Sequence, residues 1–340
     1  MRKLILPAVV LLFSVINFQI TGCAPDQPVN DSTDVNIPKA PRIPGPEFNP
    51  DSAYAYIKTQ VEFGPRVPGT PEHDACGAWM KSKMESFGYT VEVQTSPVTL
   101  YTGKTVTMMN YFAQYKPERT DRVLLVAHWD TRHIADRDTG RVTEPIDGAN
   151  DGGSGVGVLL EIARVLNEKD PNIGVDFLFV DAEDHGQPGA EGGSELSWCL
   201  GSQYWANTLS TQKPGYASTV RYGILLDMVG AQGATFPREG TSVRHASNVV
   251  EKVWSAAKDL GYGAYFVNNV TGETIDDNRF IIQGAGIKCI DIVHYDTAEG
   301  DYGPFHHRHT DNMDVIDPLT LDIVGSVVID VLYNENPPVK

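Results

Sequence analysis

Hydrophobic positions along the chain alternate between two spacings after residue 50. In some segments apolar residues recur every three to four positions, which is the period of one face of an α-helix. These segments predict helices over 51–63, 76–87, 155–167, 194–209, 245–260 and 318–333. Short apolar runs between them predict strands over 91–93, 106–112, 123–127, 175–180, 222–228 and 287–293. The chain is therefore expected to contain both element types in alternation.

This alternation, clearest in the second half of the chain, is typical of α/β proteins. Strands that alternate with helices form a mostly parallel sheet with helices on both faces, and ligands bind at the carboxyl ends of its strands. The sequence has no internal repeat and no second linker, so we expect one domain over residues 51–340.

The N-terminus has the pattern of a bacterial lipoprotein signal. Two basic residues precede an apolar run from Leu4 to Ile16, which is too short to span a bilayer with margin. Small residues then precede Cys23, as a lipoprotein signal peptidase requires. We expect a signal peptide over 1–22, a lipid anchor on Cys23, and a tether over 23–50. The protein would be exported and would face the periplasm or the cell surface.

The alternative for this region is a buried helix or a membrane anchor that continues past Cys23. Seven prolines between Ala24 and Pro50 disfavour it, because proline interrupts helices. The net charge of −17 and the lack of a basic run argue against a nucleic-acid partner. The other cysteines fit no zinc-finger spacing and are expected to be buried thiols, with one disulfide left open; they are Cys76, Cys199 and Cys289.

Side chains able to bind a metal follow one predicted strand after another. A lone aspartate after a strand is usually a cap or a turn residue, but their joint placement is hard to explain in that way. The set comprises His128, Asp130, Asp151, Glu183, Asp184, Asp227 and His309.

These residues also occur in an ordered set of motifs. The motifs are His-Trp-Asp at 128–130, Gly-Ala-Asn-Asp-Gly-Gly-Ser-Gly at 148–155, Glu-Asp at 183–184, Asp227 and His-Thr at 309–310. The set resembles that of the zinc-dependent aminopeptidases of the M28 type and their relatives, the type II glutaminyl cyclases. The resemblance extends over about residues 50–335 and implies a mixed central sheet flanked by helices.

The same resemblance implies a zinc site with an acid–base group beside it. Zinc would be held by Asp151, Asp184 and His309, a mixed oxygen and nitrogen set of the kind zinc binds. Many relatives have glutamate where this chain has Asp184. Glu183 would face the substrate as general acid and base. Relatives also hold the peptide bond after Asp151 in the cis form.

Two reactions remain open. A glutaminyl cyclase needs one Zn²⁺ and forms pyroglutamate at peptide N-termini. There His128 and Asp130 are structural, and Asp227 turns from the metal to share hydrogen bonds with Glu183 and Asp276. An aminopeptidase needs two Zn²⁺, the second held by His128, Asp151 and Asp227, to activate water.

Local sequence favours the cyclase. The strings at 128–132 and 276–280 are more similar to those of cyclases, although Arg308 precedes His309 where animal cyclases have tryptophan. A non-catalytic, peptide-binding lipoprotein is a third alternative, disfavoured because the ligands are retained. Trp198 is expected either to form a wall of the substrate pocket or to lie in a helix core. The neighbouring His306 and His307 are expected to be hydrogen-bonded or solvated residues beside the site.

Overall fold

The computed structural model of this chain describes residues 42–189 and 194–335. The expected signal peptide, Cys23 and most of the tether lie outside these ranges, so their roles stay predictions. No helix within the described ranges is long and apolar enough to span a membrane.

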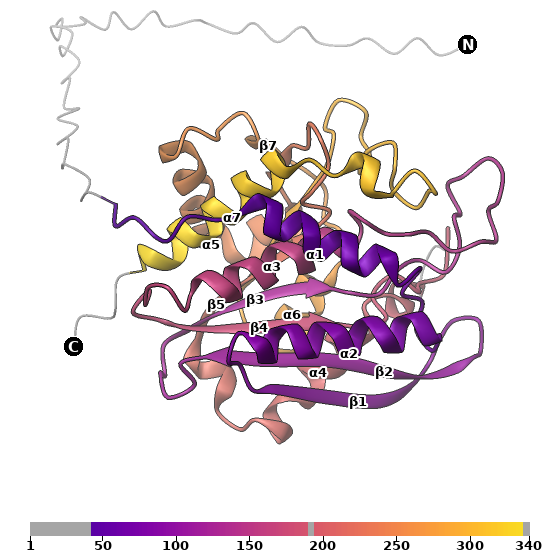
Figure 1. The fold of residues 1–340 in the computed structure, drawn as a ribbon, viewed down its shortest axis with the longest axis horizontal. Coiled ribbons are helices and arrows are strands. Elements are labelled where there is room, and N and C mark those ends of the chain that lie inside the picture. Colours follow the sequence, from indigo (N-terminus) through magenta and orange to yellow (C-terminus); the bar gives the residue numbers. More distant parts are fainter. Residues whose placement is uncertain (1–41, 190–193, 336–340) are drawn as a thin grey trace, which may run out of the picture. The chain divides into compact units, whose positions relative to one another are not determined.

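A six-stranded sheet forms the centre of the fold, in the order β1-β2-β4-β3-β5-β8 (Figure 1). Its strands are β1 (Val91–Thr99), β2 (Thr105–Tyr115), β3 (Arg122–His128), β4 (Gly174–Val180), β5 (Val220–Asp227) and β8 (Cys289–Val293). Strands β4, β3, β5 and β8 pair in parallel, whereas β1–β2 and β2–β4 are antiparallel. The expectation of a mixed, mostly parallel sheet is confirmed.

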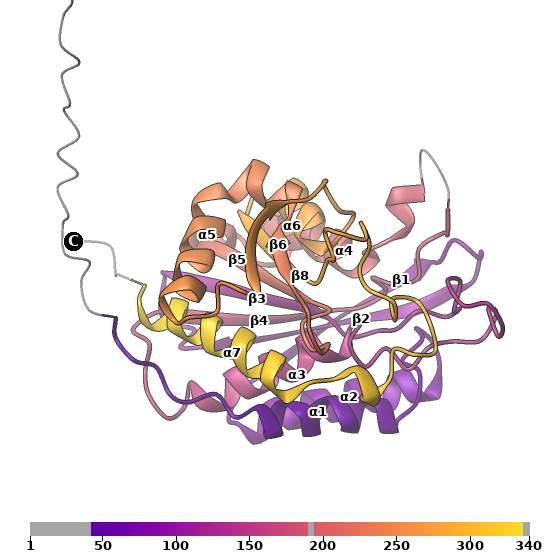
Figure 2. The same cartoon turned by 90° about the horizontal axis from the view of Figure 1, so that it is seen from above.

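Helices cover both faces of this sheet (Figure 2). One layer contains α1 (Pro50–Glu62), α2 (Pro71–Ser86), α3 (Gly153–Val165) and α7 (Pro318–Tyr333). The other contains α4 (Leu200–Gln212), α5 (Gly240–Asp259) and α6 (Asp277–Ala285). Successive side chains of a strand point to opposite faces of the sheet, so each face has its own core. In β3, Leu125 packs in the cluster with α3, whereas Leu124 packs with Trp205 of α4. The α/β fold class is therefore confirmed.

Some elements differ from the prediction. The helix expected over 194–209 is divided into a 3₁₀ turn (Ser194–Ser197) and α4, because Cys199 between them has a left-handed backbone (φ 53°). Helix α6 and a small sheet of β6 (Phe236–Arg238) and β7 (Phe266–Val270) were not expected. Two further 3₁₀ turns occur at Tyr216–Thr219 and Met313–Val315.

The packed body begins earlier than the boundary at residue 50. Arg42 donates to Asp330 on α7 (2.8 Å), and the Phe48 side chain is buried. The side chain of Asn49 caps α1 by accepting the Ser52 N–H (3.0 Å). The last residues of the expected tether therefore pack against the domain.

Candidate metal centre and active site

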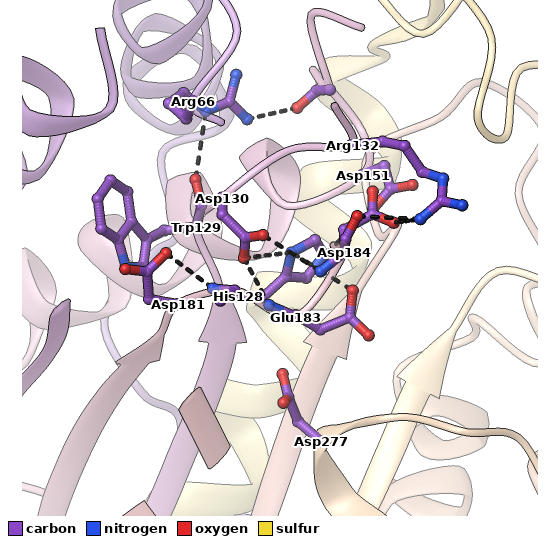
Figure 3. A network of polar contacts seen from close by, with 12 residues as sticks. Arg66, His128, Trp129, Asp130, Arg132, Asp151, Asp181, Glu183, Asp184 and Asp277 are labelled. Atoms are coloured by element: carbon purple, nitrogen blue, oxygen red, sulfur yellow. Dashed lines mark hydrogen bonds and ion pairs between the residues drawn. The ribbon is translucent and has the colours of Figure 1, made fainter. Parts of the chain in front are cut away.

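Five of the expected polar residues lie together at the carboxyl ends of the parallel strands. His128 ends β3, Asp227 ends β5, and Glu183 and Asp184 follow β4. Asp151 lies just before α3. All five side chains are buried, and Figure 3 shows four of them around a common centre. The fold thus gathers residues separated by up to about a hundred positions.

Asp130 fixes the loop that carries the two acidic residues after β4. Its carboxylate is fully buried and accepts the backbone N–H groups of Glu183 (3.0 Å) and Asp184 (3.2 Å) (Figure 3). These bonds hold the backbone in place, so Glu183 and Asp184 can point in different directions. In this structure Asp130 has a positioning role.

A first group of ligand atoms surrounds His128. Its Nε2 lies 3.1 Å from Asp227 Oδ1 and 3.2 Å from Asp151 Oδ1. Burial lowers the pKa of His128, but hydrogen bonds to Asp130, Asp151 and Asp227 outweigh it and raise the pKa well above its usual value. The ligand atoms of His128, Asp151 and Asp227 lie within 4.8 Å of one another, a spacing that one metal ion can bridge.

A second group forms between Asp184, Asp151 and His307. His307 Nε2 lies 3.2 Å from Asp184 Oδ1 and 3.8 Å from Asp151 Oδ2. All three side chains are buried, and Asp184 Oδ2 has no hydrogen-bond partner. A buried carboxylate oxygen without a partner, close to a second carboxylate and an imidazole, fits a zinc ion.

The structure brings His307 to these carboxylates, and the expected ligand His309 lies two residues further along the same loop. His309 Nδ1 contacts Asp138 Oδ2 (2.5 Å), and its Nε2 is buried without a hydrogen-bond partner. A carboxylate on one ring nitrogen leaves the other nitrogen available for a metal. The loop is anchored at Asp311, whose carboxylate accepts the N–H groups of Asn150 and Asp151 (2.8 and 3.0 Å).

A cavity of about 300 Å³ opens over both groups. Trp198 forms one wall, with its ring nearly parallel to that of His307 (7°, centroids 6.1 Å apart). A Cβ at Gly186 would lie 1.9 Å from the Trp198 ring, so the indole rests directly on the Gly186 backbone. Trp198 therefore lines the pocket and precedes α4, as the first of its two expected roles requires.

Glu183 faces this cavity among other acidic groups. Burial raises its pKa well above the usual value, and the carboxylates of Asp184 and Asp276 add to the rise, although His128 opposes it. The buried Cys199 thiol donates to Glu183 Oε1 (3.2 Å). The sequence predicted a buried thiol here, but nothing in its spacing indicated this contact. A carboxyl group that retains its proton more readily suits acid–base catalysis.

The expected hydrogen bond between Asp227 and Asp276 is not present among the described residues. The Asp276 carboxylate instead accepts the Asp277 N–H (2.6 Å) as the N-cap of α6. The Asp227 carboxylate contacts the His128 ring (Oδ1 to Nε2, 3.1 Å). Burial raises the pKa of Asp276 well above its usual value, and Asp227 adds to this rise.

The expected cis peptide bond after Asp151 is also not observed, since the described ranges contain none. Gly152 instead has a φ of 83°, which glycine adopts without steric cost. A Cβ there would lie 2.6 Å from the Asp130 carbonyl oxygen. Only glycine fits between Asp151 and the end of β3.

Comparison with known proteins identifies a family and several similar structures. Residues 110–332 match Peptidase family M28. The structure is similar to that of a glutaminyl cyclase from Bacteroides thetaiotaomicron, with 47% identity over 86% of this chain and 100% of that chain (TM-score 0.82). A Zn-dependent exopeptidase from Parabacteroides distasonis is 47% identical over 85% and 99% of the two chains (TM-score 0.80). For a glutaminyl cyclase from Porphyromonas gingivalis the identity is 46%, over 84% and 98% (TM-score 0.78).

Curated relatives are more distant. Aminopeptidase YwaD of Bacillus subtilis is 27% identical over 232 residues, which is 67% of this chain and 44% of the relative. The alkaline phosphatase isozyme conversion protein of Escherichia coli is 26% identical over 140 residues, or 38% and 41%. The chain thus spans less than half the length of these two relatives. The family match nevertheless includes most of the sheet and every residue of the two groups of candidate ligands, and this protein therefore belongs to peptidase family M28.

Proposed function

We propose that this protein is a zinc-dependent glutaminyl-peptide cyclotransferase, which converts the N-terminal glutamine of peptides to pyroglutamate and releases ammonia. The observation that carries the proposal is the buried Glu183 in the pocket, which lies beside Asp276 and has its backbone N–H bound by Asp130. Similarity over the full length of two bacterial glutaminyl cyclases supports it.

The residues proposed to hold zinc are Asp151, Asp184 and His309. Support comes from His309 itself, because Asp138 holds its Nδ1 and its Nε2 is buried without a hydrogen-bond partner. Zinc bound there would act as a Lewis acid on the side-chain carbonyl of the glutamine. One ion suffices for this reaction, because the nucleophile is the substrate's own amine and no water is activated.

Glu183 moves the proton in this mechanism. As the α-amine nitrogen bonds to the side-chain carbonyl carbon and closes the ring, Glu183 accepts a proton from that nitrogen. It then returns the proton to the amide nitrogen while the bond from that nitrogen to the carbonyl carbon breaks, and ammonia leaves. The raised pKa of Glu183 favours the first step, because a more basic carboxylate accepts the proton of the amine more readily.

A metallo-aminopeptidase is the second candidate, and one observation favours it. His128, Asp151 and Asp227 remain close enough to hold a second zinc. The similar structure from Parabacteroides distasonis is named an exopeptidase. In that function two ions would activate water, which attacks the first peptide bond, and Glu183 would accept the proton of the water.

The two functions are separated by their products. We expect the zinc-loaded chain to release ammonia from a glutaminyl peptide. The product should retain every residue of that peptide. Glu183→Gln keeps the shape of the side chain but removes proton transfer, so activity should fall by about 10²–10⁴-fold. Glu195→Gln is the matched control, since Glu195 is an exposed acid on a nearby segment that pairs with Arg279.

Free glutamine in place of ammonia, or cleavage of an alanyl arylamide at a comparable rate, would establish the aminopeptidase instead. A chain that binds peptides but gives neither product would be a non-catalytic member of the family. Ammonia release that survives Glu183→Gln would contradict the assigned acid–base role.

We also propose that the protein is exported and anchored by a lipid on Cys23, facing the periplasm or the cell surface. The support is the sequence of residues 1–23 alone. Two or more acyl chains give stable anchoring where one does not. Wild type grown with labelled palmitate should carry the label in the membrane fraction, and Cys23→Ala should carry none. Equal labelling of both would contradict the anchor.

A further inference from the structure

A buried arginine connects the two loops that hold the carboxylates proposed to bind zinc. Arg66 lies between α1 and α2, and its side chain is fully buried. Its guanidinium donates to three main-chain carbonyl oxygens, those of Trp129 (from Nε, 3.3 Å), Asp147 (from Nη1) and Gly148 (from Nη2, 2.7 Å). Figure 3 shows the bond from Arg66 to the backbone just before Asp130.

One of these acceptors lies at the support of Asp184. Trp129 directly precedes Asp130, whose carboxylate accepts the backbone N–H of Asp184 (3.2 Å). The Thr131 N–H in turn donates to the Arg66 carbonyl oxygen (3.2 Å). Bonds in both directions therefore hold this segment against Arg66.

The other two acceptors begin the turn that carries Asp151. The Gly148 carbonyl oxygen accepts the Gly153 N–H (3.1 Å) as well as the bond from Arg66, so the arginine binds where this turn closes. A Cβ on Gly153 would lie 2.8 Å from that oxygen, so the turn can close this tightly only with glycine. The turn is thus held by a guanidinium at its carbonyl groups and by the Asp311 carboxyl group at its N–H groups.

The contacts favour arginine over lysine at position 66. A guanidinium has its donors in a fixed planar fork and can bind carbonyl groups on two loops at once, whereas an ammonium is a compact point charge. The three bonds use all three nitrogens of the Arg66 side chain. Lysine would keep the charge but lose the bridge between the loops.

We propose that Arg66 is a positioning residue that fixes the spacing between the zinc ligands Asp151 and Asp184 and thereby sets the affinity of the protein for zinc. This inference rests on the zinc site of the proposed function. Ligands that are already held in place bind a metal more tightly, because binding then orders little of the chain. Arg66 lies outside the lining of the cavity and acts through the backbone of the two loops.

The chain contains a matched control at the other end of β3. Arg122 is also buried, and it donates to the carbonyl oxygens of Tyr115 and Lys116 (3.0 and 2.7 Å) and pairs with the buried Asp176. It is the first residue of β3, whereas the proposed ligands lie near the carboxyl ends of the strands. Loss of either arginine should destabilise the fold, but only loss of Arg66 should change the zinc site.

The test compares the zinc affinity of variants of the full chain by competition with a chromogenic chelator. Arg66→Lys should weaken zinc binding by about 10–100-fold, the usual effect of losing a group that orients metal ligands. Arg66→Met removes the charge as well and should weaken binding at least as much. Arg122→Lys should bind zinc as wild type does. The absorption spectrum of the cobalt(II)-loaded protein should change for both Arg66 variants and stay unchanged for Arg122→Lys, since only the former move a ligand.

Wild-type affinity and an unchanged cobalt spectrum in both Arg66 variants would overturn the inference. An equal loss of affinity in Arg122→Lys would overturn it as well, because the effect would then follow from general destabilisation. If Arg66→Met does not fold, as judged by circular dichroism, Arg66→Lys decides the question by the same criterion.

The outcome is independent of the reaction, which is identified by its product. Weaker zinc binding in the Arg66 variants of a chain that releases free glutamine would retain the positioning role and reject the cyclase. Ammonia release by wild type together with undiminished zinc affinity in those variants would retain the cyclase and reject the positioning role.

Discussion

Unusual backbone conformations concentrate at the pocket. Six non-glycine residues in the described ranges have a positive φ, and four of them adjoin the site: Ala182, Cys199, Met228 and His307. Such conformations cost about 1–3 kcal/mol each and persist only where surrounding contacts enforce them. Here the Cys199 N–H donates to the Glu183 carbonyl oxygen (3.0 Å) and the Arg137 N–H to that of His307 (3.4 Å). The strained residues direct the neighbouring acid and ligand side chains inward.

The backbone conformation of the loops also limits what the sequence can predict for individual residues. The acidic residues of the site follow strands, so their positions could be inferred from the hydrophobic pattern. The contacts of the histidines could not, because the loop holds His306, His307 and His309, and spacing alone does not show that His307 contacts Asp184 or that Asp138 holds His309.

The thiols provide a prediction at this scale. Cys76, Cys199 and Cys289 are free and buried. Burial raises the pKa of Cys76 to about 11 and the pKa values of the other two well above the usual value. Because the thiolate is the reactive form and appears only above the pKa, the folded protein at pH 8 should not react with Ellman's reagent.

Cys23→Ala should be used for this measurement, since it removes the remaining cysteine of the chain. Guanidinium should then release three reactive thiols. Rapid labelling of the folded protein, or fewer than three thiols after unfolding, would contradict the buried and unpaired state of these cysteines.

At the scale of elements, long periodic segments were predictable and short ones were not. Every residue of β3 and β4 is buried, which produces continuous apolar runs in the sequence. Helix α6 has nine residues with three adjacent apolar positions at 280–282, so no helical period is visible. Its N-cap is Asp276, and the position of this catalytic candidate therefore depended on an element that the pattern did not reveal.

The contact between α3 and the sheet can be tested at a glycine. A Cβ on Gly155 would lie 2.2 Å from the Leu226 carbonyl oxygen and 3.0 Å from Ala127 Cβ, so the helix can pack this closely only with glycine. Gly155→Ala should lower the free energy of unfolding by about 1–3 kcal/mol through overpacking. Urea denaturation measures this change. Gly263→Ala is the control, because its Cβ would meet nothing within 4 Å. Equal stability of the two variants would indicate that α3 shifts without cost.

At the scale of the whole molecule, negative charges outnumber positive ones. The chain has a net charge of −17, and several of its carboxylates are buried around one cavity. Among the described residues near this cavity, the cationic groups that contact these carboxylates are His128, His307 and Arg132. Like charges at close range destabilise the folded state unless protons or a cation neutralise them. A bound metal should therefore contribute to the stability of the entire domain.

Metal removal tests this coupling. A ligand that binds only the folded state stabilises it by about 2.7 kcal/mol at a free concentration 100 times its Kd. For a domain of this size about 1 kcal/mol shifts the melting temperature by roughly 2–4 °C, so chelation should lower it by about 5–10 °C. Zinc should restore the original value. His309→Ala should melt at the same temperature with and without zinc, because one of the three proposed ligands is lost. His307→Ala tests the neighbouring histidine, whose Nε2 contacts Asp184 and Asp151. Identical melting of zinc-loaded and chelated wild type would refute the coupling, and a response lost in His307→Ala but kept in His309→Ala would place His307 in the ligand set.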